Sequence, residues 1–555
     1  MSDQCLRLLM LASRPSDYAE MSQLARGLAD RGHKPTLIYF YAPTDPGSEP
    51  IVRSIEELGH TLDARAVDID EVQLGPTTEV QAAATAEEIE RSQAAEIKLY
   101  QFVLTLRDRV LGRDLARALR ENLPTVRKIF PVIYKVARVV DMVRNLPGGM
   151  RMAGRAINER LRSSREMPLS FRLKLVLMGP KVVTDAAFME RIYRRFLAYF
   201  RDTIAAAQSD ALLIPEDIVG NLWPVSIKAA HQAGIPALVF PYTLANKEEA
   251  FQSLKGEPPY QTSRNQIASV LYPRWRLVEA GADIVRLPSA HIFAHERLGI
   301  APPDPWMMNS GFSDRVCVDS QAAFEYFRAG GIPVEQLRVV GSISQDEMAV
   351  RRGTRSARLD ELRTALSLSG SKPVLLISGC PNQLAASVPF CEFGSIGDVA
   401  AFVGESVAPL SEHYHLVVRP HPNYPEFAAM LQPFGVVTSM AATSTLVPLA
   451  DVFVAFASAT IRWAIACGIP TVNYDVFHYR YGDFTGATGV TTVTGGVEFR
   501  DLVRSLVPGS PQWQAQSARA QADSAHWSVM DGKSLPRIEE EIVHARARRA
   551  TMKRE

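Results

Sequence analysis

A short segment, Arg419-Pro420-His421-Pro422, carries side chains suited to binding phosphate and follows an apolar run, 415–419, with the character of a buried strand. Arginine and histidine both donate hydrogen bonds to phosphate oxygens, and the two prolines stiffen the turn that holds them. Ligands of parallel α/β sheets bind outside the carboxyl ends of the strands. We therefore expect Arg419 and His421 to contact a phosphate group; a rigid strand-to-helix turn without a ligand is the alternative.

Two hydroxyl residues, Ser458 and Thr460, form a second candidate site after a predicted strand, 451–457. They precede a helix that we expect to run to Cys467, with Arg462 in its first turn. A hydroxyl at the helix N-cap would lie beside backbone N–H groups and the positive end of the helix dipole, which attract an anion. A plain serine cap is the alternative.

Two further residues at strand ends complete this predicted donor-binding set. Gly379 would let the backbone approach a phosphate, because glycine has no Cβ. Asp475 would bind a ribose or sugar hydroxyl, or else cap a turn. The full set contains Gly379, Arg419, His421, Ser458, Thr460, Arg462 and Asp475.

A pair of adjacent carboxylates, Glu216 and Asp217, follows another predicted strand, 211–215. Neighbouring carboxylates raise one another's pKa, and one of them can then act as a general base toward a hydroxyl group. Asp217 is the candidate catalytic base, with Glu216 beside it; an aspartate cap on a helix beginning near Gly220 is the alternative. Arg14, in the turn after the first strand, faces the same presumed cleft and is a candidate contact for an acceptor or a phosphate.

The elements that must position these motifs alternate between short apolar strands and helices. At the N-terminus, strand 6–12 is followed by helix 18–31 and strand 35–42, which is the βαβ beginning of a parallel sheet. The same alternation returns over 211–341 and again from residue 372. The sequence therefore predicts an α/β fold with two Rossmann-like domains.

The predicted domain boundaries follow this alternation. The first domain covers 1–345, with a helical insertion at about 101–205, and a charged linker region covers 346–371. The second domain covers 372–540, and a basic tail that we expect to fray covers 541–555.

Composition and missing motifs argue against several functional classes. The chain has 61 Lys and Arg against 60 Asp and Glu, so a generally basic nucleic-acid-binding protein is not expected. The turn after the first strand lacks the GxGxxG pattern of dinucleotide cofactors. No DxD-type aspartate pair lies at a strand end, and the five cysteines lack ligand spacing, so no metal site is expected. Neither a signal peptide nor a run of about 18 apolar residues is found, so we expect a cytoplasmic protein.

Residues 101–181 are strongly basic compared with the rest of the chain. They contain 14 Arg and 4 Lys against 3 Asp and 3 Glu, a net charge of +12. Aromatic and aliphatic side chains are interleaved with these charges, which predicts basic amphipathic helices. Such helices bind an anionic membrane surface or an anionic glycan; a solvated basic face is the alternative.

These motifs resemble those of the GT-B glycosyltransferases of bacterial capsule and lipopolysaccharide assembly. That set includes bacterial sialyltransferases, capsular Kdo transferases and the related polyol-phosphate polymerases. Its members carry an acidic pair in the first domain, an HP motif, and a Ser/Thr pair before a helix. By this resemblance Asp217 would be the base, His421 would bind the nucleotide phosphate, and Ser458 and Thr460 would bind phosphate or carboxylate. Two features depart from the pattern: Ile218-Val219 separates the acidic pair from the next glycine, and the hydroxyl pair is split by an alanine.

The resemblance implies a metal-independent GT-B glycosyltransferase on the inner face of the cytoplasmic membrane. Its donor would be a CMP- or UDP-sugar, which is a substrate and not a cofactor, and its acceptor would be a surface glycan or a lipid-linked glycan. Two alternatives use the same fold, a CDP-polyol phosphotransferase and a sugar-nucleotide epimerase. A non-catalytic nucleotide-binding assembly protein is an alternative from another class.

Overall fold

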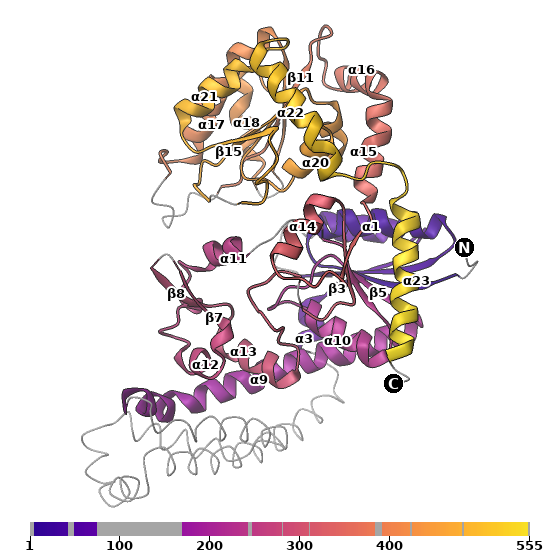
Figure 1. Cartoon of the computed structure of the whole chain (residues 1–555), viewed down its shortest axis with the longest axis vertical. Helices are drawn as coiled ribbons and strands as arrows, with labels where there is room; N and C mark the ends of the chain where they lie inside the picture. The colour runs from indigo at the N-terminus through magenta and orange to yellow at the C-terminus, as the bar shows by residue number, and fades with distance from the viewer. Residues whose placement is uncertain are drawn as a thin grey trace, which may run out of the picture.

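Short apolar runs form the strands of two parallel sheets, one in each of two α/β domains (Figure 1). The predicted fold, two Rossmann-like domains of the GT-B type, is confirmed by this architecture. The computed structural model describes residues 5–42, 49–74, 169–241, 247–279, 281–309, 311–382, 391–421, 424–479 and 482–552.

The sheet of the first domain has seven parallel strands in the order β10-β9-β6-β5-β1-β2-β3. From β1, the chain first forms β2 and β3 toward one edge of the sheet. It then returns to the other side of β1, where it forms β5 and the strands toward the opposite edge. The direction therefore reverses between β1 and β5, and this is the topological switch point of the sheet. The strands are β1 (Arg7–Ala12), β2 (Lys34–Tyr41), β3 (Asp63–Asp68), β5 (Ala211–Ile214), β6 (Ala237–Val239), β9 (Arg315–Val318) and β10 (Leu337–Val339).

Helices cover both faces of this sheet because successive side chains of each strand point to opposite sides. One face packs against α9 (Leu169–Ala207) and α10 (Trp223–Ala233). The other face packs against α1 (Pro15–Asp30), α2 (Glu49–Leu58) and α23 (Ser534–Met552). Three further helices of the domain are α3 (Ile69–Leu74), α13 (Ser289–Leu298) and α14 (Gln321–Ala329).

Helix α9 shows where the predicted insertion ends. Its residues Tyr193, Phe196 and Phe200 recur at helical spacing and are buried against the sheet. The later part of the range predicted as an insertion, about 101–205, is therefore a core helix of the domain. Most of the basic segment 101–181 lies outside the described residues.

A small module follows β6 in the first domain. Its two antiparallel strands are β7 (Arg276–Glu279) and β8 (Ala282–Val285). Helices α11 (Lys247–Leu254) and α12 (Gln266–Leu271) accompany them, with the short 3-10 turns η2 (Pro258–Tyr260) and η3 (Pro273–Trp275).

The sheet of the second domain has six parallel strands in the order β13-β12-β11-β14-β15-β16. Its switch point lies between β11 and β14, by the same reasoning as in the first domain. The strands are β11 (Val374–Ser378), β12 (His415–Arg419), β13 (Val437–Thr438), β14 (Val452–Ala455), β15 (Thr471–Tyr474) and β16 (Val490–Val493).

Helices also cover both faces of the second sheet. One face packs against α17 (Ile396–Val407), α18 (Glu426–Leu431) and α21 (Gly496–Ser505), and the other packs against α20 (Ile461–Ala466) and α22 (Pro511–Trp527). The shorter elements are α19 (Thr443–Leu446), η4 (Ala408–Glu412), η5 (Gln432–Phe434) and η6 (Val447–Leu449).

Helices occupy most of the predicted linker and most of the predicted tail. Helices α15 (Ile343–Gly353) and α16 (Arg355–Ala365) occupy the predicted linker, 346–371. The prediction that the tail 541–555 is frayed is wrong up to Met552. Helix α23 returns to the first domain, where its apolar residues are buried and its basic residues form ion pairs, Arg546 with Asp210 and Arg549 with Asp314.

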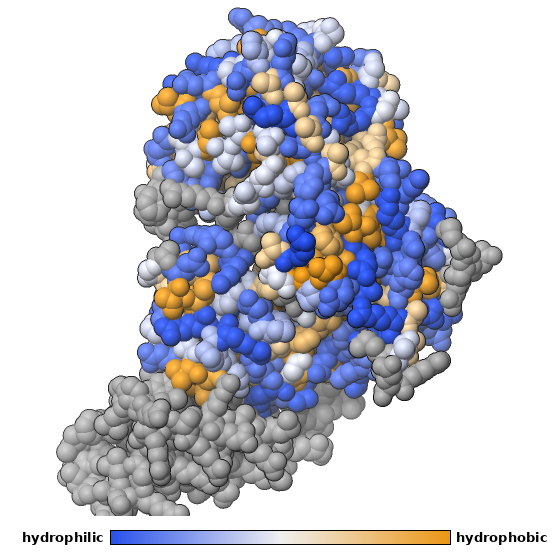
Figure 2. Space-filling model, viewed as in Figure 1, coloured by the Kyte–Doolittle hydropathy of each residue, from blue (hydrophilic) through white to orange (hydrophobic). Residues whose placement is uncertain are grey.

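The outer surface is consistent with cores that lie between the sheets and their helices. On the face in Figure 2, hydrophilic residues cover most of both domains and apolar residues occur in smaller groups. Within the described part of the chain, no helix combines the length and apolarity of a membrane span. The five cysteines are unpaired.

Candidate active site

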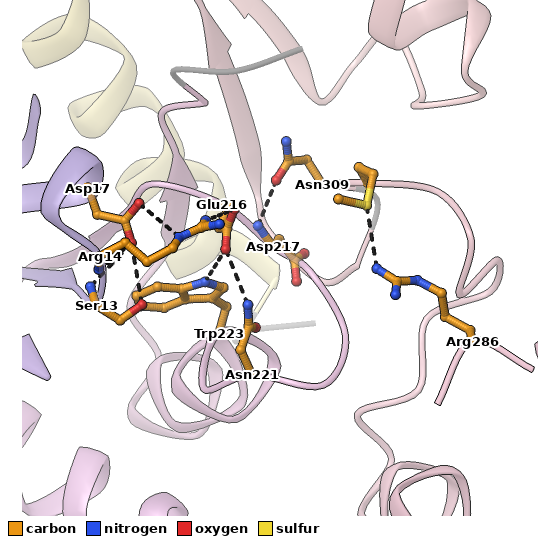
Figure 3. A network of polar contacts seen from close by, with 10 residues as sticks. Ser13, Arg14, Asp17, Glu216, Asp217, Asn221, Trp223, Arg286 and Asn309 are labelled. Carbon is orange, nitrogen blue, oxygen red and sulfur yellow. Dashed lines mark hydrogen bonds and ion pairs between the residues drawn. The ribbon is translucent and has the colours of Figure 1, made fainter. Parts of the chain in front are cut away.

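The switch point of the first sheet brings together three of the predicted residues. Arg14 follows β1, and Glu216 and Asp217 follow the neighbouring strand β5 (Figure 3). Because β1 and β5 are parallel neighbours, their carboxyl ends meet at the same edge. We call Arg14, Glu216 and Asp217 the carboxylate cluster.

Glu216 is held by three donors. Its side chain forms an ion pair with the guanidinium of Arg14 and accepts hydrogen bonds from Trp223 Nε1 at 3.0 Å and Asn221 Nδ2 at 3.2 Å. The residue is only 5% exposed, and this burial raises its pKa while the charge of Arg14 opposes the rise. Figure 3 shows these donors surrounding one carboxylate, so its geometry is fixed before any ligand binds.

Arg14 is oriented by a residue that the motif analysis missed. Asp17, fully buried in the first turn of α1, accepts hydrogen bonds from the backbone N–H groups of Ser13 and Arg14 at 3.2 and 3.1 Å. Its other oxygen lies 3.5 Å from Arg14 Nε. Asp17 directly precedes the predicted helix 18–31, and an acidic residue at the start of a helix is the sequence signal that could have indicated this role. The Arg14 side chain remains half exposed, so it is accessible to a ligand.

Asp217 belongs to a buried loop contact, which excludes the helix-cap alternative. Helix α10 begins only at Trp223, and its N-cap is Leu222. The Asp217 carboxylate instead accepts a hydrogen bond from Phe312 N at 2.9 Å. Gly311 packs against the same carboxylate so closely that a Cβ there would overlap it.

The environment of Asp217 raises its pKa above that of an exposed aspartate. The side chain is 3% exposed, and burial raises its pKa to about 6, while backbone N–H groups of residues 311–313 oppose the rise. Its own backbone N–H donates to Asn309 Oδ1 at 2.7 Å. Asn309 was not predicted, because no local motif marks it; it adopts a left-handed backbone, with φ of 61°.

The second sheet brings four predicted residues to one edge. Four consecutive strands of the sheet are each followed by one of them: β12 by His421, β11 by Gly379, β14 by Ser458 and β15 by Asp475. We call this set the second-domain edge. It lies at the switch point between β11 and β14, where ligands of open α/β sheets bind.

Gly379 has a packing role in this edge. Its N–H donates to the carbonyl of Arg419 at 2.7 Å, and a Cβ at this position would overlap the backbone N of His421. Glycine is therefore needed where the loops after β11 and β12 touch. Its contact with a phosphate remains a prediction.

The charges of the HP segment are modified by partial burial. The Arg419 guanidinium donates to the carbonyls of Ala441, at 3.1 Å, and Pro420, and burial lowers its pKa. Burial also lowers the pKa of His421, and the positive charge of Arg419 lowers it further. Both effects favour the neutral imidazole at pH 7, and a neutral imidazole has one N–H donor.

The hydroxyl pair binds to itself instead of capping the helix. Ser458 Oγ and Thr460 Oγ1 are 2.8 Å apart, and Ser458 Oγ also accepts from the Thr460 N–H at 3.3 Å. Thr460 occupies the N-cap of α20, one of the two positions expected, but its side chain makes no capping hydrogen bond. The helix ends at Ala466, one residue before the predicted Cys467.

The backbone before this pair is strained. Ala457 has a positive φ of 47°, which a residue with a Cβ rarely adopts. The Asn473 side chain supports this conformation by accepting the Ala457 N–H at 2.8 Å. Residues in such conformations gather at functional sites. A polar residue inside the apolar strand 470–474 is the signal that could have pointed to Asn473.

The last two predicted donor-binding residues have protein partners. Arg462 forms a buried ion pair with Asp319 of the first domain at 3.0 Å, and so joins the two domains. Asp475 is buried and accepts from the Tyr479 N–H at 2.9 Å, as in the turn-cap alternative. Roles for Arg462 and Asp475 toward a ligand stay predictions. Among the described residues, no group of three or more His, Cys, Asp or Glu could hold a metal ion.

Comparisons with known proteins match no family model and no curated protein sequence. Solved structures with a similar fold include the UDP-GlcNAc 2-epimerase of Neisseria meningitidis bound to UDP-GlcNAc, at 9% identity, with 97% of this chain and 99% of that chain covered and a TM-score of 0.49. The UDP-GlcNAc 2-epimerase of Methanocaldococcus jannaschii matches at 8% identity, over 97% of this chain and 99% of that chain, with a TM-score of 0.45. The wall teichoic acid polymerase TagF matches at 13% identity, over 62% of this chain and 75% of that chain, with a TM-score of 0.38. Matches this distant assign no function to the chain.

Proposed function

We propose that the protein is a glycosyltransferase that moves a sugar from a CMP- or UDP-activated donor to a hydroxyl of a surface-glycan or lipid-linked acceptor. The observation that carries the proposal is the chemistry of the two switch points. The carboxylate cluster in the first domain suits a hydroxyl that must lose a proton, and the second-domain edge suits a phosphate. A transfer between two substrates needs a site for each, and two open α/β sheets supply them. The acceptor is assigned to the first domain and the donor to the second.

On the donor side, neutral hydrogen-bond donors replace a metal. His421 offers an N–H, and Ser458 and Thr460 offer hydroxyls that can exchange their mutual bond for bonds to phosphate oxygens. These contacts would stabilise the negative charge that develops on the leaving nucleotide. We expect full activity after EDTA treatment; a loss that Mg²⁺ or Mn²⁺ restores would contradict metal independence.

On the acceptor side, Asp217 is the proposed general base. The acceptor oxygen bonds to the anomeric carbon of the donor sugar, and the bond from that carbon to the phosphate oxygen breaks. The hydroxyl proton passes to Asp217, and the electron pair of the broken bond leaves with the nucleotide. A pKa of about 6 keeps Asp217 ionised at pH 7, yet makes it a stronger base than an exposed aspartate. Glu216, through its ion pair with Arg14, would hold the Arg14 side chain in place at this edge of the sheet.

Donor binding and product mass together test the proposal. Thermal shifts of the purified protein with CMP-, UDP-, GDP- and CDP-compounds identify the donor class, since a ligand at 100 times its Kd stabilises by about 2.7 kcal/mol. The product should gain the mass of one sugar. A gain of polyol phosphate would indicate phosphotransfer, and conversion of the donor without any acceptor would indicate epimerisation. Binding with no donor consumed would indicate a non-catalytic assembly protein.

We further propose that the protein acts at the inner face of the cytoplasmic membrane, through the basic segment 101–181. A Lys or Arg near an anionic membrane surface contributes about 1 kcal/mol of binding within a Debye length. Liposome co-sedimentation should show binding to anionic vesicles, release at high salt, and loss of binding when Lys128, Lys135, Arg138 and Arg144 are changed to Glu. No binding to such vesicles would favour an anionic glycan as the partner of the segment.

A further inference from the structure

Arg286 lies at the end of β8 in the small module, and its backbone is anchored there. Its backbone N–H donates to the carbonyl of Trp275 at 2.8 Å. The side chain extends from the module toward the loop that carries Asn309, as Figure 3 shows. Its Nη2 lies 3.7 Å from the sulfur of Met308, which is a weak acceptor.

The guanidinium of Arg286 is buried without a counter-ion. The residue is 8% exposed, and its Nε has no hydrogen-bond partner. No carboxylate of the described residues forms an ion pair with it. Tyr260 and, more weakly, Glu216 influence its charge electrostatically, and Glu216 is engaged by Arg14. A buried charge normally has a partner, since removing it from water costs several kcal/mol. This arginine is therefore an exception that calls for a ligand.

A second buried donor without an acceptor lies beside it. Trp306 is 2% exposed, and its Nε1 also lacks a hydrogen-bond partner. The central carbon of the Arg286 guanidinium lies 5.9 Å from the centroid of the Trp306 ring. Buried polar groups are nearly always paired, so two neighbouring N–H groups left open point to one missing acceptor. Both groups only donate, and one of them is cationic, so the complementary group is an oxyanion.

The position of this pair connects it to the carboxylate cluster. Met308, which contacts Arg286, directly precedes Asn309, whose side chain accepts the backbone N–H of Asp217. An anion bound by Arg286 would thus lie close to the loop that holds the proposed base. We infer that Arg286 and Trp306 form a binding site for an acidic group, a carboxylate or a phosphate, on the acceptor substrate. The link to an acceptor rests on the proposed function; the anion site itself does not.

Binding of small acidic sugars to the full-length protein tests the inference. The probes are methyl glucuronide for a carboxylate and glucose 1-phosphate for a phosphate, with methyl glucoside as the neutral control, each followed by calorimetry. We expect one acidic probe to bind and the neutral probe not to bind, and the probe that binds identifies the anion. If neither acidic probe binds the wild-type protein, the inference is overturned.

Variants locate the binding. Arg286→Gln should weaken the acidic probe roughly tenfold or more, because a charge-assisted contact is lost, whereas Arg286→Lys should retain part of the affinity. Arg276→Gln is the matched control, because Arg276 lies in the same module but is exposed and paired with Asp283. Trp306→Phe removes one donor while keeping an aromatic ring and serves if the Arg286 variants do not fold. Wild-type affinity in both Arg286→Gln and Trp306→Phe would mean that the two donors only bind water.

A nucleotide-binding measurement separates this inference from the proposed function. Nucleotide binding is assigned to the other domain, so Arg286→Gln should leave the thermal shift with the best nucleotide unchanged. If the wild-type protein consumes no donor but binds acidic sugars through Arg286, the proposed function fails while the anion site stands. If donor is transferred and no acidic probe binds, the anion site fails while the proposed function stands.

Discussion

The two switch points differ in how firmly their polar groups are held by protein partners when no substrate is bound. In the carboxylate cluster, Glu216 is held by two hydrogen bonds and an ion pair, and Asp217 is fixed by the loop 311–313. At the second-domain edge, Ser458 and Thr460 bind mainly to each other, and burial favours the neutral imidazole of His421. The first site is therefore built on buried carboxylates in fixed positions, whereas the second presents an imidazole and two hydroxyls whose mutual bond can be exchanged.

This difference suits the two halves of a transfer reaction. A general base needs a fixed geometry and a raised pKa, both of which burial supplies. A phosphate site needs donors that can turn toward the ligand, and hydroxyls that bind each other give up little when they do so. Residues of the first site should thus govern rate, and residues of the second should govern affinity.

The largest expected effect tests the first half of this comparison. Asp217→Asn should lower the transfer rate by about 10²–10⁴-fold, with little loss of donor affinity, because the base is lost while asparagine can still accept from Phe312 N. Steady-state rates and donor calorimetry measure the two quantities. Asp283→Asn is the control and should be active, because Asp283 is a partly exposed carboxylate of the same domain, paired with Arg276. A wild-type rate for Asp217→Asn would place the base elsewhere.

The second half of the comparison predicts a loss of binding. His421→Ala and Ser458→Ala should each weaken nucleotide binding by about 1.5–3 kcal/mol if the lost contact is charge-assisted. The fold should survive, as circular dichroism can check. His413→Ala, an exposed histidine of the same domain, should bind as the wild type does. Unchanged affinity in both test variants would remove the donor site from this edge.

The raised pKa of Asp217 predicts a pH profile that sharpens the rate side of the comparison. Burial raises this pKa to about 6, and the base acts only when ionised. The kcat/KM should therefore fall as pH decreases through about 6, by roughly tenfold per pH unit below it. The residual activity of Asp217→Asn should lack this limb. If kcat/KM fell only near the pKa of an exposed aspartate, the ionisation would belong to another group.

The smallest expected effect concerns the contact between the two domains. Burial raises the pKa of Glu20 on α1 to about 7, although Arg462 and Ser344 oppose the rise. Its folded pKa lies above its unfolded value of 4.5, so its contribution to stability is present below pH 4.5 and is lost as pH rises through about 7. Glu20→Gln should therefore stabilise the protein by about 1 kcal/mol at pH 8 and have little effect near pH 4.5.

Apparent melting temperatures at the two pH values measure this effect. The exposed Glu57→Gln on α2 is the control and should show no such difference between them. Equal shifts for Glu20→Gln at both pH values would show that the ionisation of Glu20 is not coupled to folding.

Local patterning predicted most strands of both sheets, and the reason is physical. Strands buried on both faces must be continuous apolar runs, and such runs are visible without a structure. The run 415–419 is observed as strand β12 with the same bounds, and the helix predicted at 18–31 is observed as Pro15–Asp30. The ends of apolar runs also locate the polar residues that follow them, including Asp217 and His421.

Partners from distant parts of the chain could not be predicted in this way. Arg462 pairs with Asp319 across the domain interface, and Arg546 pairs with Asp210 because α23 returns to the first domain. Neither pair has a spacing rule, because its two members come together only when the domains pack. The unpaired N–H groups of Arg286 and Trp306 could not be predicted from the sequence either, because a missing partner is recognisable only when the positions of all neighbours are known.

The sequence by itself therefore determined the fold class, most strands, and the polar residues at strand ends, because these depend on patterns within about ten residues. Only the tertiary structure decided which strand ends are neighbours. Strand order makes β1 adjacent to β5 and β11 adjacent to β12, and it thereby brings Arg14 to Glu216 and Gly379 to His421. The order depends on how the helices pack on both faces of each sheet, which is a long-range balance of burial that no local motif encodes.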